Sequence, residues 1–268
     1  MRCLLIIAVL ASAAHADPKA DAKKLVDEQI KVFKSGEDDK LRALFDPDAI
    51  VIGQRRREAG KDLSGGYFVP NMFGGSPHTQ LKKLVLKSIA AAGGDAKVFW
   101  FTAELTASAH IPEPGFGARN ETLTLRLTEL VVGGKIVAAA LDHAAVPEEW
   151  TNGDITGATE AGSLTAMLAT PATTGAALAA DGFAIGTDKG ERAVGPAAKK
   201  LLGKWAKLEL SVEGKPREVR TATWGFAQAR IAWKQKKETV HMLGFVIATP
   251  KPDGTWTPIG VHYSASNL

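Results

Sequence analysis

The chain has 268 residues, and its hydrophobic share of 45% is that of a globular protein, which excludes a disordered chain. Its 33 Lys and Arg against 29 Asp and Glu give a net charge of +4. These charges are interspersed, so we expect no basic arm for nucleic acid. The length allows one large domain or two small ones.

The first sixteen residues resemble a secretory signal. Met1 and Arg2 supply a positive end, residues 3–10 form an apolar run, and Ala14 and Ala16 occupy the small-residue positions of a cleavage site. The apolar run is shorter than the ~20 residues that span a bilayer as a helix. We therefore expect cleavage after Ala16, a secreted or periplasmic location and no membrane anchor. The alternative is a buried N-terminal helix.

The single cysteine, Cys3, lies inside this expected signal. The mature chain would then have no disulfide, no thiol nucleophile and no thiolate metal ligand. Secreted domains without disulfides depend on an adequate hydrophobic core, which a chain of this length can build.

The first half is predicted to combine helices with a long antiparallel β stretch. In chain order we expect helices over 21–33 and 38–45, a turn at 46–48, and strands over 49–52, 98–110, 121–132 and 135–143. Residues 121–132 alternate apolar and polar side chains as a half-buried strand does, and Gly133-Gly134 is typical of a hairpin turn. Residues 81–91 fit either a helix or a strand.

The second half follows the same order. The expected elements are helices over 162–168 and 171–180, a turn at 181–182, and strands over 183–186, 205–212, 217–233, 238–249 and 256–264. Trp100 matches Trp224, residues 121–123 match 238–240, and residues 142–144 match 261–263. This order predicts a tandem repeat, with inserts near 64–78 and 111–118 in the first half. The alternative is two unrelated α+β domains.

Two segments of the second half carry a family resemblance. Residues 181–195 (DGFAIGTDKGERAVG) resemble the D-G-x-x-x-G-T-D-x-G-E segment of SnoaL-like proteins, a branch of the NTF2-like superfamily. Residues 253–264 (DGTWTPIGVHYS) resemble the D-G-x-W…H-x-S close of that branch. In the first half only residues 48–53 (DAIVIG) resemble the first segment, and no Gly-Thr-Asp follows them.

The resemblance implies an α+β fold of two tandem NTF2-like (cystatin-like cone) domains. Each would be a curved antiparallel sheet wrapped around N-terminal helices and enclosing a mostly apolar pocket. We place domain 1 at 17–148, a linker at 149–160 and domain 2 at 161–268. Members of the superfamily include isomerases, polyketide cyclases, dehydratases and non-catalytic binders, so the fold does not determine the function.

The resemblance also nominates catalytic residues. In ketosteroid-isomerase-like members an aspartate just after the first strand is the general base, and the second half offers Thr187 and Asp188 there. The first half offers Gly53 and Gln54, which cannot take a proton. His262 could orient a ligand or accept its proton. Asp188 and His262 are thus the catalytic candidates for proton abstraction beside a carbonyl. The simpler alternatives are a capping role for Asp188 and a structural hydrogen bond for His262.

Further pocket candidates come from the matched strands and their neighbours: Trp100, Glu104, His143, Thr187, Glu191, Trp224 and Arg230. The six histidines show no metal-ligand spacing and no phosphate-binding motif is present, so we expect neither metal nor cofactor. The expected function is binding of a small apolar ligand, or of an envelope protein, without catalysis. The alternative is a cofactor-free isomerase or cyclase. Because a fused pair could cover its own open sheet faces, we predict a monomer of two pseudo-symmetric domains.

Overall fold

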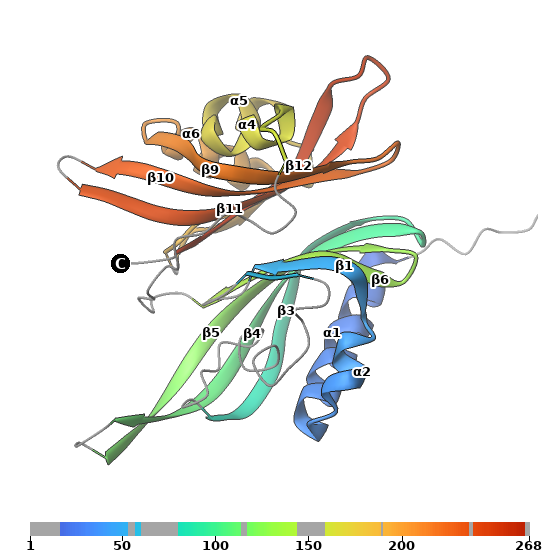
Figure 1. Cartoon of the computed structure of the whole chain (residues 1–268), viewed down its shortest axis with the longest axis vertical. Coiled ribbons are helices and arrows are strands. Elements are labelled where there is room, and N and C mark those ends of the chain that lie inside the picture. Colours follow the sequence, from blue (N-terminus) through green and yellow to red (C-terminus); the bar gives the residue numbers. More distant parts are fainter. Residues whose placement is uncertain are drawn as a thin grey trace, which may run out of the picture.

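The computed structural model describes residues 17–52, 57–59, 80–113, 117–143, 159–188, 190–235 and 238–265. The expected signal, the insert at 64–78 and nearly all of the expected linker lie outside these ranges. Two β-sheets lie face to face, and the helices cover the outer side of each (Figure 1). No helix in the described ranges is long and apolar enough to cross a membrane.

In the described ranges, the first domain has two helices and a six-stranded sheet. Its elements are α1 (Pro18–Ser35), α2 (Asp38–Arg42), β1 (Phe45–Ile52), β2 (Arg57–Ala59), β3 (Gln80–Gly94), β4 (Val98–Glu113), β5 (Gly117–Val132) and β6 (Lys135–His143). The strand order is β2-β1-β6-β5-β4-β3. Strand β1 runs parallel to β6, and the other neighbours are antiparallel.

The second domain repeats this arrangement strand for strand. Its elements are α4 (Ser163–Ala169), α5 (Pro171–Ala177), β7 (Phe183–Ile185), β8 (Arg192–Val194), α6 (Pro196–Trp205), β9 (Glu209–Arg220), β10 (Gly225–Gln235), β11 (Glu238–Pro250) and β12 (Trp256–Ala265). The order is β8-β7-β12-β11-β10-β9, and β7 is parallel to β12 as β1 is to β6. The expected α+β fold of two tandem domains is therefore confirmed.

Local sequence signals explain where several elements begin and end. The carboxylate of Asp17 accepts hydrogen bonds from the backbone N–H groups of Lys19 (3.0 Å) and Ala20 (3.3 Å), which caps the start of α1. Gly36 ends α1 with a left-handed φ of 69°. Gly133 and Gly134, at φ 57° and 78°, form the predicted hairpin turn between β5 and β6.

Alternation along the strands divides the apolar side chains among three cores. On β5, Leu125 and Leu127 face α1, whereas Leu130 faces the second domain. The middle core joins the two sheets, and in it the ring of Trp100 packs 5.4 Å from the ring of Phe183. The third core lies between the second sheet and helices α4 to α6. Each sheet therefore buries side chains on both of its faces.

The structure corrects two local predictions, adds one helix and decides one segment that the sequence left as helix or strand. Residues 196–205 form helix α6, which we did not predict, although Pro196 stands in its first turn and Ala198, Leu202 and Trp205 are buried at helical spacing. The predicted turn at 46–48 lies within β1, where the register with β6 shifts. The predicted strand 217–233 is two strands, because residues 221–224 separate β9 from β10. Residues 81–91, which fit either a helix or a strand by sequence, belong to strand β3.

The proposed match of His143 with His262 is also wrong. In the first sheet Ile52 pairs with Ala140, and in the second Ile185 pairs with His262. Ile52 and Ile185 are equivalent because each pairs with the first residue of the next short strand. Ala140 therefore holds the position of His262. The match failed because the turn before β12 is longer than the two-glycine turn before β6.

Candidate functional site

A pocket of about 250 Å³ opens in the second domain. It lies where the connection from β7 to β8 meets the end of α6 and the strands β9 to β12. The lining residues are Gly186, Thr187, Asp188, Glu191, Trp205, Leu208, Leu210, Trp233, Val240, Met242 and Tyr263. Most of them are apolar, and the polar ones come from the single connection that borders the mouth.

Aromatic rings form much of the wall. The rings of Trp205 and Tyr263 meet edge to face with centroids 5.4 Å apart. The hydroxyl of Tyr263 donates a hydrogen bond to the backbone oxygen of Leu168 at 2.7 Å. Burial raises the pKa of Tyr263, so this hydroxyl stays protonated. Because its proton is already engaged, Tyr263 serves the pocket as an apolar surface and not as an acid.

A short connection with two carboxylates borders the mouth. Glu191 accepts hydrogen bonds from the indole N–H of Trp205 (2.9 Å) and the backbone N–H of Asp188 (3.3 Å). A Cβ at Gly186 would collide with the Glu191 carboxylate and the Trp205 ring, so only glycine fits there. Among the residues that the structure describes, none bonds the exposed carboxylate of Asp188.

The first domain supports this connection from outside. Arg126 of β5 is buried, and its guanidinium donates to the backbone oxygens of Asp188 (2.9 Å) and Thr187 (3.3 Å). Arg192, which follows the connection, forms an ion pair with Glu104 of β4. The candidate site therefore belongs to the second domain, but its mouth is held by both.

The structure separates the two catalytic candidates. Asp188 lines the mouth of the pocket, whereas His262 is 1% exposed and its Nδ1 lies 3.0 Å from the Oγ1 of Thr128 in the first domain. His262 and Tyr263 are successive residues of β12, so their side chains point to opposite faces of the sheet. Tyr263 faces the pocket, and His262 faces the other domain. Proton transfer at Asp188 would have to work without His262.

The other predicted pocket residues fall into two groups. Thr187 and Glu191 line the pocket. The remaining side chains described belong to the face between the domains: Trp100 packs on Phe183, Trp224 stacks on Phe226, Glu104 pairs with Arg192, and Arg230 lies 3.7 Å from Glu213. The side chain of His143 lies outside what the structure describes. No cluster of His, Cys, Asp and Glu in the described ranges could hold a metal ion.

Sequence reasoning missed three aromatic residues of the wall. Trp233 and Tyr263 were predicted to lie in strands, but the face of the sheet to which they point was not predicted. The position of Trp205 depends on helix α6, which was not predicted. It also missed Glu129, a fully buried carboxyl on β5 to which the side chain of Gln29 donates at 3.0 Å. Burial raises the pKa of Glu129 to about 8. The sequence did carry a signal for its burial. Glu129 lies two residues after Leu127 and four after Leu125, so its side chain points to the same face of β5 as theirs.

Comparison with known proteins yields likeness of fold only. No protein-family model matches the chain, and no curated protein matches it. A ketosteroid isomerase-like protein from Erwinia carotovora atroseptica is 10% identical, with a TM-score of 0.38, over 48% of this chain and 98% of that one. A protein described as a SnoaL-like polyketide cyclase, from Jannaschia sp. CCS1, is 13% identical, with a TM-score of 0.34, over 48% of this chain and 88% of that one.

A third structure, described as a polyketide cyclase from Xanthomonas campestris, is 18% identical, with a TM-score of 0.33, over 46% of this chain and 90% of that one. Each match thus spans most of the other protein and about half of this chain. Likeness at these values says nothing of activity. The strand order and the helix packing of this chain define its fold.

Proposed function

We propose that the protein binds a small, mostly apolar molecule in the pocket of its second domain. The observation that carries the proposal is the composition of the pocket: its described lining includes Trp205, Trp233 and Tyr263, and the carboxylates in it, Asp188 and Glu191, come from the connection between β7 and β8. Such a cavity favours a ligand that buries a flat apolar body and keeps one polar end toward solvent. Its volume of about 250 Å³ suits a molecule of one or two rings.

The mouth specifies the polar end of this ligand. The Glu191 carboxylate is already engaged by Trp205 and by the backbone, so Asp188 is the group available to the ligand. An exposed carboxylate accepts hydrogen bonds and attracts positive charge. The ligand we propose therefore carries a hydroxyl or an amine at the end that faces Asp188.

A thermal-shift screen of small aromatic amines and alcohols tests the proposal. A ligand at a hundred times its Kd stabilises by about 2.7 kcal/mol. At ~2–4 °C per kcal/mol for a chain of this size, we expect a shift of roughly 5–11 °C. Because Trp205 and Trp233 line the pocket, binding should also change the tryptophan fluorescence.

A pocket-filling variant locates the binding. Val240→Trp places a large ring where the pocket is, so it should abolish the shift. Val212→Trp is the matched control, because Val212 packs against the same core without lining the pocket. Equal shifts in both variants would refute the proposed site.

The alternative is a cofactor-free enzyme in the same pocket, with Asp188 as the general base. Its support is one position: a carboxylate at the mouth of an apolar cavity, where a carbon acid could be held beside it. It predicts turnover of a carbonyl compound that Asp188→Asn abolishes while binding persists. If wild type and Asp188→Asn both bind the compound and neither turns it over, the binding function is favoured.

A further inference from the structure

A second cavity, of about 420 Å³, lies in the first domain between α1 and β3. Helix α1 contributes Lys19, Lys23, Asp27, Ile30 and Lys34, and β3 contributes residues 84–89. Strand β3 is the last strand of its sheet, so the groove runs along the sheet edge under the helix. Every lining residue that the structure describes belongs to these two elements, and none of them lines the pocket of the second domain.

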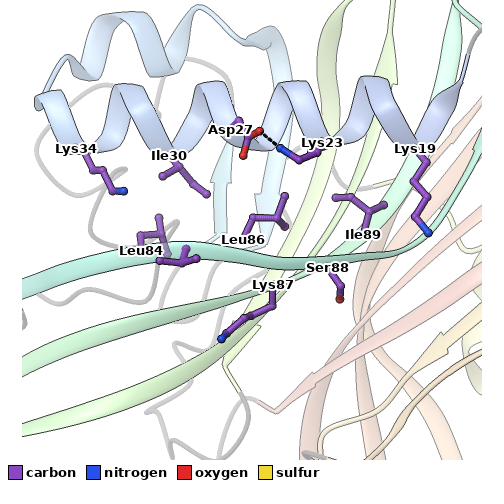
Figure 2. A pocket seen from close by; sticks show the side chains of 11 residues that line it. Lys19, Lys23, Asp27, Ile30, Lys34, Leu84, Leu86, Lys87, Ser88 and Ile89 are labelled. Atoms are coloured by element: carbon purple, nitrogen blue, oxygen red, sulfur yellow. Dashed lines mark hydrogen bonds and ion pairs between the residues drawn. The ribbon is translucent and has the colours of Figure 1, made fainter.

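The floor of the groove is apolar. Figure 2 shows Ile30 of α1 above Leu84, Leu86 and Ile89 of β3, with these side chains in the space between helix and strand. Ile30, Leu84 and Ile89 are buried, and Leu86 is half-buried. Such a floor favours the hydrocarbon part of a ligand over a polar group.

Positive charge marks both ends of the floor. Lys23 is paired with Asp27 at 2.5 Å, so this lysine is neutralised within the helix. Lys19 and Lys34 stand at opposite ends and point toward β3 (Figure 2). Among the described side chains no carboxylate pairs with either of them. They are 15 residues apart, about 22 Å along the helix axis.

We propose that this groove binds a long-chain fatty acid. The hydrocarbon chain would lie on the floor formed by Ile30, Leu84, Leu86 and Ile89, and the carboxylate would meet the ammonium group of Lys19 or Lys34. Charge complementarity selects this occupant: Lys19 and Lys34 line the groove without a carboxylate partner among the described residues, and its one described aspartate is already paired with Lys23. Affinity should rise with chain length, about fourfold for each further methylene buried.

Calorimetric titration with dodecanoate, below its micelle concentration, tests the proposal. The double variant Lys19→Ala/Lys34→Ala should bind about tenfold more weakly, because it loses the charge-assisted hydrogen bond. The matched control is Lys24→Ala/Lys31→Ala, which removes the same charge from the same helix but not from the groove. Leu86→Trp, which fills the groove, should abolish binding. Each single lysine variant then identifies the end that holds the carboxylate.

The remaining outcomes count against the groove. Equal weakening in the two double variants would mean a diffuse attraction to the helix and would overturn the proposal, as would no binding of dodecanoate at all. Loss of binding in Val240→Trp, with normal binding in Leu86→Trp, would place the fatty acid in the second-domain pocket. That result would overturn the groove site while supporting the proposed function.

Discussion

The buried carboxyl of Glu129 should make the stability of the first domain fall as pH rises. Desolvation raises its pKa to about 8 from a model-compound value of 4.5, and the hydrogen bond from Gln29 opposes part of that rise. Below pH 4.5 the folded and the unfolded chain both hold the proton. Between about 4.5 and 8 only the folded chain keeps it, so unfolding releases a proton and becomes easier at higher pH.

The size of the effect follows from the difference between a pKa of about 8 in the folded chain and 4.5 in the unfolded chain. At 1.36 kcal/mol per unit, wild type loses up to ~5 kcal/mol of unfolding free energy across this range. The value of ~5 kcal/mol is an upper limit, because water that enters the core would solvate the charged carboxylate and reduce the loss of unfolding free energy. Glu129→Gln keeps the shape and cannot ionise, so the variant should lose the pH dependence due to this group.

Glutamine is the right replacement for Glu129 because Gln29 is the hydrogen-bond partner of this side chain. The Oε1 atoms of Glu129 and Gln29 are both buried, and neither accepts a hydrogen bond from a residue in the described ranges. A proton on Glu129 supplies the missing donor, so acid and amide can bond each other twice. The amide of Glu129→Gln supplies an N–H to the same oxygen, which keeps the pair satisfied.

Urea unfolding at pH 5, 6, 7 and 8, followed by circular dichroism, measures the slopes. Wild type should lose stability with pH more steeply than Glu129→Gln, and the two should differ most at pH 8. Glu160→Gln is the control, because Glu160 is exposed and should leave the wild-type slope unchanged. Parallel slopes for wild type and Glu129→Gln would refute a neutral buried carboxyl.

Three further predictions concern other parts of the chain. Trp100→Ala should destabilise the protein by ~3–5 kcal/mol, because it empties the space beside Phe183 between the sheets, and urea midpoints measure the loss. Gly186→Ala should cost ~1–3 kcal/mol by displacing Glu191 and should also weaken ligand binding; binding equal to wild type would count against the role given to the mouth. We predict that the chain is exported and that its mature form begins at Asp17; mass spectrometry that finds the first sixteen residues retained, or another N-terminus, would show that the expected signal is wrong.

Local patterns predicted much of the fold because they report on one strand or helix at a time. Alternation in 121–132 and the two glycines that follow predicted β5 and its hairpin, and apolar spacing predicted α1. Helix α6 was missed because it is only ten residues long, although it begins with proline, a start signal that we applied to Pro171 alone.

The candidate site was harder to predict because it depends on faces and distances. Asp188, Thr187 and Glu191 could be found, since one motif holds all three. The location of His262 could not, because adjacent residues of a strand point to opposite sides and the sequence did not say which side holds the pocket. That Arg126 supports the mouth required knowledge of how the domains pack.

The face-to-face sheets have a consequence for assembly. In a homodimer that buried such faces, two separate chains would have to associate at a rate set by their concentration. Both chains would also carry every substitution, because one gene encodes them. Here the two faces share one polypeptide, so their effective concentration is set by the connecting segment and not by dilution. The halves are also free to specialise. One holds the buried pair of Glu129 and Gln29 beside a groove lined by lysines, while the other has a pocket whose described carboxylates are Asp188 and Glu191.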